Sequence, residues 1–92
     1  MSKVRIHAFV YGVVQGVNFR YNTMKFAKSL RLTGWVKNLP DGSVEVVAEG
    51  EEEKIESFVY FLKKGSFLAR IDKLDVTKET YKGEFQDFDI LH

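Results

Sequence analysis

The sequence contains no cysteine, and this excludes disulfide bonds, thiol catalysis and zinc sites built from thiolates. Charge of one sign is not in excess either, because 14 Lys and Arg residues against 13 Asp and Glu residues give a formal net charge of +1. A chain with that balance lacks the protein-wide positive field that drives non-specific binding of nucleic acid. We therefore expect no nucleic-acid partner, and any site for an anion must be local.

Long hydrophobic runs are also missing from the sequence. No segment approaches the roughly 20 apolar residues of a membrane-spanning helix, and residues 1–5 do not have the apolar run of a signal peptide. Chains without cysteine fit a reducing compartment. We therefore expect a cytoplasmic protein with no membrane partner.

The composition that is present is typical of one globular domain. Hydrophobic residues make up 45% of the 92 residues and charged residues 29%, which is the mixture of a folded domain and not of a disordered chain. A chain of this length buries one core but not two. We therefore assign residues 1–92 to a single domain.

The period of the hydrophobic pattern changes from two to about 3.6 near residue 19. In the first segment alternate residues are apolar, which predicts a strand with one buried face. These residues are Val4, Ile6, Ala8 and Val10. In the next segment four apolar residues and a threonine share one side of a helix, while Lys25 and Lys28 face water. These five residues are Phe19, Thr23, Phe26, Ala27 and Leu30.

Residues 33–38 and 43–49 are two short β-prone segments separated by Leu39-Pro40-Asp41-Gly42. Pro40 fixes φ and Gly42 permits a positive φ, so the intervening segment is typical of a turn. The pattern predicts a β-hairpin.

The second half of the sequence predicts a helix followed by two strands. Residues 51–65 begin with three glutamates and end with two lysines and a glycine, an order that suits the helix dipole and the C-terminal cap. Apolar residues alternate in 69–80, and 85–91 provides a last short strand. The order βαββαβ with a C-terminal strand predicts the α+β class, as a ferredoxin-like sandwich with two helices on one face of a mostly antiparallel sheet. Polar residues 86–87 can protect an edge strand, so we expect a monomer.

The junction between the first strand and the first helix is Gly12-Val13-Val14-Gln15-Gly16-Val17-Asn18-Phe19-Arg20. Successive N–H groups in a glycine-flanked turn form a positive concavity, and the helix N-terminus adds its dipole. Arg20 adds a planar guanidinium that suits phosphate oxygens. Because a cation at a helix N-terminus opposes the dipole, its placement there favours a bound anion over an ordinary surface charge.

A second segment, Gly34-Trp35-Val36-Lys37-Asn38, follows the first helix. Together the two segments match the patterns G-x-V-Q-G-V-x-F-R and G-W-V-x-N of the acylphosphatase family, and Gly42, Val44 and Gly50 match its later positions. The chain resembles that family from about residue 4 to about residue 89.

The resemblance implies hydrolysis of the carboxyl–phosphate bond of a small-molecule acyl phosphate, with inorganic phosphate as a product. It implies that Arg20 and Asn38 are catalytic: Arg20 binds the phosphoryl group together with the backbone amides of the loop, and Asn38 orients the attacking water. It also implies no metal, no cofactor and no phosphoenzyme. The residues of this phosphate-binding loop are Gln15, Gly16, Val17, Asn18, Phe19 and Arg20.

Other interpretations of these residues stay open. A non-catalytic ferredoxin-like module could use the loop to bind a phosphorylated ligand or an RNA backbone, and Asn38 alone could simply start the turn. The aromatic residues could form the stacking surface of an RNA-recognition domain, but the signature of that domain is missing, so core packing is favoured. These residues are Trp35, Phe58, Phe61, Phe67, Phe85 and Phe88.

The remaining polar residues are weaker candidates. His7 lies within the first strand, and we expect His92, the last residue, to be frayed. The glutamates at 51–53 suit the start of a helix better than a metal site.

Two positions depart from the family pattern. Asn18 tolerates the left-handed backbone that the loop needs, whereas Arg31 replaces a glycine that closes the first helix in many relatives. We expect either a helix end without a positive φ or a strained Arg31.

Overall fold

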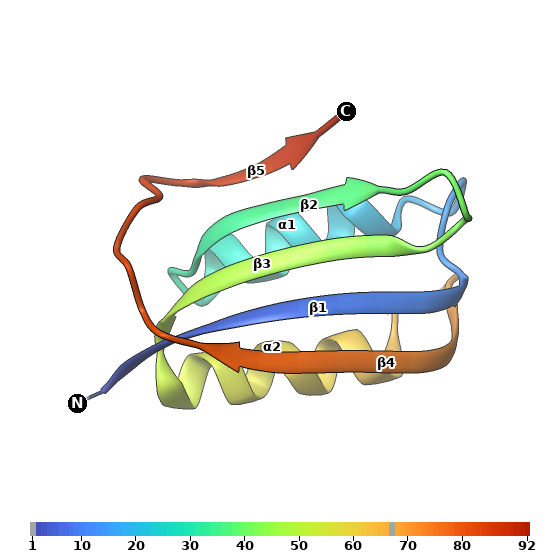
Figure 1. Cartoon of the computed structure of the whole chain (residues 1–92). Helices are drawn as coiled ribbons and strands as arrows, with labels where there is room; N and C mark the ends of the chain where they lie inside the picture. The colour runs from blue at the N-terminus through green and yellow to red at the C-terminus, as the bar shows by residue number, and fades with distance from the viewer. Residues whose placement is uncertain (1, 67) are drawn as a thin grey trace.

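The computed structural model describes residues 2–66 and 68–92 as a five-stranded sheet with two helices packed on one face (Figure 1). The elements in chain order are β1 (Lys3–Val13), α1 (Phe19–Ser29), β2 (Thr33–Asn38), β3 (Val44–Glu51), α2 (Glu52–Lys64), β4 (Arg70–Glu79) and β5 (Phe88–Leu91). The strand order is β4-β1-β3-β2-β5, and neighbouring strands are antiparallel except for β2 and β5, which are parallel. This arrangement confirms the predicted ferredoxin-like α+β fold with a short C-terminal strand.

The core lies between the sheet and the helices. The residues of β1 that face the helices, Ile6, Ala8 and Val10, are at most 1% exposed, as the alternation predicted. The rings of Phe58 in α2 and Phe88 in β5 are fully buried, with centroids 5.9 Å apart in an edge-to-face arrangement. Burial of each such side chain contributes roughly 1.5–3 kcal/mol. The helices are therefore held to the sheet by the apolar faces that the sequence pattern predicted.

The other aromatic residues considered above divide between the core and the half-buried surface. Phe61 packs against the core, whereas Trp35 and Phe85 are half-buried. Phe67 lies outside the described residues. The prediction of core packing is thus confirmed for Phe58, Phe61 and Phe88.

The two helices end in different ways. In α2, Lys63 and Lys64 occupy the last turn and Gly65 follows with a φ of 76°, so the predicted glycine cap is confirmed. Beyond the end of α1, Arg31 has a φ of 58°. Of the two expectations for this position, the strained one is therefore observed, at a cost of roughly 1–2 kcal/mol. Neither helix is long and apolar enough to cross a membrane, as far as the described residues extend.

The last residues of β1, β2 and β5 lie at the same edge of the molecule, although these strands are distant in the sequence. The register pairs Val10 of β1 and Asn38 of β2 with one residue, Val44 of β3. Strand β5 runs parallel to β2 with Leu91 opposite Lys37. Because β1 leads directly into α1, the start of α1 and the ends of β2 and β5 meet there (Figure 1).

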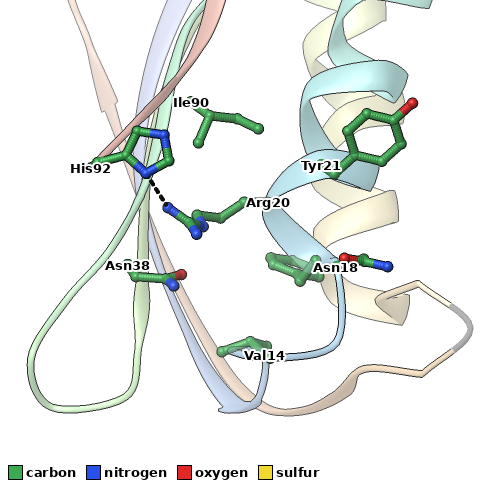
Figure 2. A pocket seen from close by; sticks show the side chains of 9 residues that line it. Val14, Asn18, Arg20, Tyr21, Asn38, Ile90 and His92 are labelled. Carbon is green, nitrogen blue, oxygen red and sulfur yellow. Dashed lines mark hydrogen bonds between the residues drawn. The ribbon is translucent and has the colours of Figure 1, made fainter.

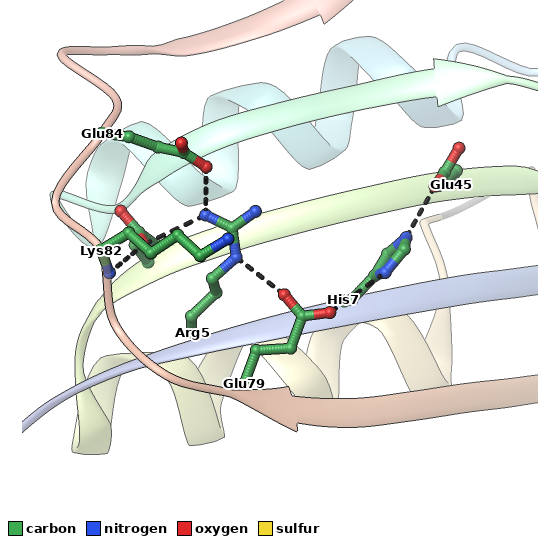
Figure 3. A network of polar contacts seen from close by, with 7 residues as sticks. Arg5, His7, Glu45, Glu79, Lys82 and Glu84 are labelled. Atoms are coloured by element: carbon green, nitrogen blue, oxygen red, sulfur yellow. Dashed lines mark hydrogen bonds and ion pairs between the residues drawn. The ribbon is translucent and has the colours of Figure 1, made fainter.

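Residues 80–87 connect the two edge strands, and Arg5 fastens the start of this connection to β1 (Figure 3). The Arg5 guanidinium donates from Nε to Glu79 at 2.8 Å, and from Nη1 to Glu49 at 3.2 Å and Glu84 at 2.5 Å. Glu49 is 1% exposed, and its Oε2 also accepts a hydrogen bond from the backbone N–H of Lys82 at 2.8 Å. We call Arg5 and these three glutamates the Arg5 network; it fixes the path of the chain towards β5.

The ionised forms of the Arg5 network stabilise one another. Burial lowers the pKa of Arg5, but the hydrogen bonds to Glu84, Glu79 and Glu49 more than offset this effect, so the pKa is raised. The hydrogen bond from Arg5 is the largest cause that holds the pKa of Glu79 below its usual value. The contact between Arg5 and Glu79 is therefore an ion pair and not a neutral hydrogen bond.

We predict that Arg5→Met lowers the free energy of unfolding by about 3 kcal/mol, because it leaves the buried Glu49 carboxylate without its counter-charge. Lys78→Met is the control, since Lys78 and Glu52 form an exposed ion pair at 3.4 Å. Such pairs contribute less than about 1 kcal/mol. Urea denaturation measures both changes, and equal small losses in the two variants would show that the Arg5 network does not hold the fold.

The pH dependence of the free energy of unfolding reports the charge of the Glu79 carboxylate. Because its pKa is lower in the folded protein than in the unfolded chain, its contribution to stability is complete above the unfolded pKa and is lost as the pH falls through the folded pKa. Glu79→Gln should therefore cost more stability at pH 7 than at about pH 3. A loss of the same size at both pH values, measured by urea denaturation, would contradict this ionic role.

Candidate active site

A cavity of about 260 Å³ lies where the start of α1 meets the ends of β2 and β5 (Figure 2). It is formed by the loop after β1, the first turn of α1 and single residues of the two strands. The lining residues are Val14, Gly16, Asn18, Phe19, Arg20, Tyr21, Asn38, Ile90 and His92. The structure therefore brings together the two predicted catalytic residues, which are 18 positions apart in the sequence.

The loop reaches the helix through two left-handed residues. Gly16 has a φ of 76° and Asn18 has a φ of 61° with a ψ of 22°. A Cβ atom at Gly16 would meet no atom within 4 Å, so the backbone conformation, not space, favours glycine there. Asparagine is one of the few other residues that adopts this conformation readily, which confirms the expectation for Asn18.

The start of α1 faces the cavity without a cap of its own. Asn18 at the N-cap position makes no side-chain cap hydrogen bond, and the first turn contains no acidic residue, within the described chain. The first N–H groups of a helix have no partner inside the helix and carry its positive end charge. This end of α1 can therefore donate hydrogen bonds to an anion in the cavity.

The Arg20 guanidinium lies between α1 and β5 and is held from the last two residues of the sequence (Figure 2). Its Nη1 donates to the carbonyl oxygen of Leu91 at 3.2 Å and lies 3.5 Å from Nδ1 of His92. Among the residues that line the cavity, Arg20 carries a permanent positive charge, and no Asp or Glu is present. The side chains that line the cavity therefore suit an anion.

Asn38 ends β2 with its side chain directed into the cavity (Figure 2). Its Oδ1 is buried and has no hydrogen-bond partner among the described residues. A buried acceptor without a partner costs roughly 1–3 kcal/mol. Asn38 therefore has a free acceptor beside the cavity, and a role beyond starting the turn stays a prediction.

The turn that follows Asn38 is closed by its own hydrogen bonds. Leu39 N–H donates to the carbonyl oxygen of Ser43 at 2.9 Å. Asp41 Oδ1 accepts from the Ser43 hydroxyl at 2.5 Å and from the Ser43 N–H at 2.9 Å. The bond from the hydroxyl is the main cause that lowers the pKa of Asp41. The predicted hairpin is thus confirmed, and its turn gives the end of β2 a defined direction.

The predicted loop residues have different roles in the structure. Gly16, Asn18, Phe19 and Arg20 line the cavity, whereas Gln15 and Val17 do not. Val17 packs against the core. The Gln15 side chain instead points to the hairpin turn, where Nε2 donates to the carbonyl oxygens of Leu39 and Ser43.

Ile90, Tyr21 and His92 line this cavity although no sequence motif indicates them. The expectation of a frayed His92 is wrong, because its imidazole lies beside Arg20. No local pattern could have indicated this contact, because it depends on the parallel pairing of β5 with β2. In the described part of the chain, no group of three or more His, Cys, Asp or Glu side chains is placed to hold a metal ion.

The sequence and the fold are similar to proteins of one family. The acylphosphatase family model matches residues 6–90. Acylphosphatases from Syntrophus aciditrophicus and Caldanaerobacter subterraneus subsp. tengcongensis are 46% and 47% identical over 88 residues, which is 96% of this chain and 92% and 98% of theirs. The crystal structure of acylphosphatase from Bacillus subtilis matches with a TM-score of 0.93 and 38% identity, covering 97% of this chain and 99% of that chain. The matched residues include every segment that forms the cavity except the last two residues.

We predict that the left-handed conformation at position 18 controls anion affinity. Asn18→Gly should leave the Kd for inorganic phosphate within about twofold, whereas Asn18→Val should weaken it about tenfold. A β-branched residue costs roughly 1–2 kcal/mol in this conformation, so the loop would relax away from it. Asn22→Val, within α1, is the matched control, and titration calorimetry is the measurement. Equal affinities of the Gly and Val variants would refute the role of this conformation.

Proposed function

Because the chain belongs to the acylphosphatase family, we propose that it hydrolyses acyl phosphates to a carboxylate and inorganic phosphate in the cavity beside Arg20. One observation carries the assignment of the site. The Arg20 guanidinium, the uncapped N-terminus of α1 and the orphaned Oδ1 of Asn38 all border the same cavity. These groups are a cation, a set of N–H donors and a neutral acceptor.

We propose that Arg20 and the backbone amides of residues 15–20 bind the phosphoryl group. A transferring phosphoryl group carries negative charge on its equatorial oxygens, and fixed donors around those oxygens stabilise the transition state. The guanidinium supplies two parallel donors, and the helix N-terminus supplies N–H groups with a favourable dipole. Arg20 is held by the carbonyl oxygen of Leu91, so part of the cost of ordering it is met before substrate binds.

Asn38 acts on the water. Its Oδ1 accepts a hydrogen bond from the water and leaves a lone pair of the water oxygen directed at phosphorus. The water oxygen becomes the fourth oxygen of inorganic phosphate and brings both of its protons, so the phosphate leaves as H₂PO₄⁻ and loses a proton to solvent afterwards. The bonding electrons of the broken P–O bond leave with the carboxylate. Because a carboxylate is a good leaving group, orientation of the water suffices and a strong base is not required. We propose that the reaction needs no metal ion, since Arg20 and the N–H donors meet the charge.

A small-molecule acyl phosphate is the substrate that this family implies. A monomeric state and a cytoplasmic location stay predictions from the sequence.

We predict that the protein hydrolyses a simple aromatic acyl phosphate in the presence of a chelator. Arg20→Ala should lower kcat/KM at least about 100-fold, and Asn38→Ala should lower kcat about 100-fold with little change in KM. The matched controls are Arg70→Ala on β4 and Asn22→Ala on α1, neither of which lines the cavity. Substrate consumption followed by absorbance measures all five proteins.

Three outcomes separate the interpretations. Loss of turnover in both site variants and not in the controls supports the assignment. Turnover within tenfold of wild type in either site variant would remove that residue from the mechanism. Saturable binding of phosphate by the wild type without any turnover would instead indicate a non-catalytic binding module.

A further inference from the structure

The side chain of Gln15 makes two hydrogen bonds that phosphate binding does not explain. Its Nε2 donates to the carbonyl oxygens of Leu39 at 2.8 Å and Ser43 at 2.9 Å, which lie 24 and 28 positions further along the sequence. Both acceptors belong to the turn that follows Asn38, while Gln15 itself directly precedes the cavity-lining Gly16. The carboxamide of Gln15 therefore joins the phosphate-binding loop to the segment that carries Asn38.

The two bonds depend on the closed form of the turn. The carbonyl oxygen of Leu39 also accepts from Gly42 N–H at 3.1 Å, and that of Ser43 also accepts from Leu39 N–H at 2.9 Å. Gln15 therefore binds the second lone pair of each carbonyl, and one nitrogen reaches both only when the turn is closed. Among the hydrogen bonds of the described residues, these two alone connect residues 14–18 with residues 39–43.

A primary amide suits this position chemically. Its NH₂ group provides two donors in one plane without a net charge. A carboxylate of the same size would place acceptors against two acceptors, and an apolar side chain would provide no donor. The pair of carbonyls is therefore matched to glutamine and not merely to a polar residue.

We propose that Gln15 is a positioning residue that sets Asn38, and with it the attacking water, relative to the phosphoryl group held by Arg20. The inference rests on the proposed function, because it concerns the positions of Arg20 and Asn38 relative to each other. The Gln15 side chain does not line the cavity, so it acts through the turn. A displacement of about 1 Å between reacting groups costs about 100-fold in rate. Loss of these bonds should therefore slow the chemical step more than it weakens phosphate binding.

Gln15→Leu tests this separation. It should lower kcat about 10- to 100-fold while the inhibition constant of inorganic phosphate, which reports the loop and Arg20, changes less than about threefold. Gln86→Leu is the matched control, because Gln86 is the other glutamine of the chain and is exposed. An unchanged kcat, or a parallel loss of kcat and phosphate affinity, would overturn the proposal.

Gln15→Glu adds a second measurement, the pH dependence of kcat, which separates positioning from a purely structural role. At neutral pH its carboxylate faces two carbonyl oxygens, whereas the protonated acid donates one hydrogen bond. The ratio of variant to wild-type kcat should therefore rise at least about threefold between pH 7 and about pH 5. The neighbouring carboxylate of Asp41 stays ionised in this range because its pKa is lowered. The ratio for Gln86→Glu should stay constant, and a constant ratio for Gln15→Glu would contradict the proposal.

The outcomes distinguish this inference from the proposed function. If Arg20→Ala and Asn38→Ala lose activity but both Gln15 variants keep it, only the positioning role fails. If Arg20→Ala or Asn38→Ala keeps activity, the role that the proposed function gives to that residue fails instead. Should neither Gln15 variant fold, hydrogen exchange of the Gln15 Nε2 protons in the wild type decides the matter by NMR: slow exchange of both protons supports the bonds, and fast exchange of both overturns them.

Discussion

The turn between β1 and α1 is the constraint on which the site depends. Two left-handed residues, Gly16 and Asn18, reverse the chain within a few positions and direct the N-terminus of α1 at the end of β2. Glycine and asparagine are the residues that accept this conformation at low cost. The proposed anion site thus depends first on the backbone conformation of these two residues.

Strand pairing brings the other parts of the site to this turn. The central strand β3 pairs with β1 on one side and with β2 on the other, which places Asn38 near the end of β1. The parallel pairing of β5 with β2 brings the carbonyl oxygen of Leu91 to Arg20. The Arg5 network holds the connection that leads to β5, although it lies towards the opposite end of β1. The Arg5 network and the contact of Arg20 with Leu91 thus lie at opposite ends of the same connection, which runs from β4 to the end of β5.

The sequence predicted the fold and the meeting of Arg20 and Asn38 at one cavity, because each rests on a local pattern: alternation, helical spacing, or a motif of fewer than ten residues. Their catalytic roles stay predictions. The sequence also indicated that position 18 has to accept a left-handed backbone. It did not predict the contact of His92 with Arg20, which are 72 positions apart in the sequence. Nor did it predict the hydrogen bonds from the Gln15 side chain, whose acceptors are 24 and 28 positions away. Such contacts depend on strand order and register, which the hydrophobic pattern does not specify. For the same reason, Gln15 could be assigned to the loop from its motif while the direction of its side chain could not.

We propose that the phosphate site is the loop at residues 15–20, including the Arg20 side chain. An NMR titration of the wild-type protein with inorganic phosphate tests it most directly, by following the backbone amides and the Arg20 side-chain Nε–H together. If phosphate binds there, the shifts saturate with one common Kd and are largest for the amides of residues 16–20 and for the Arg20 side chain. Saturable shifts centred on another surface, with the loop and Arg20 unchanged, would contradict it.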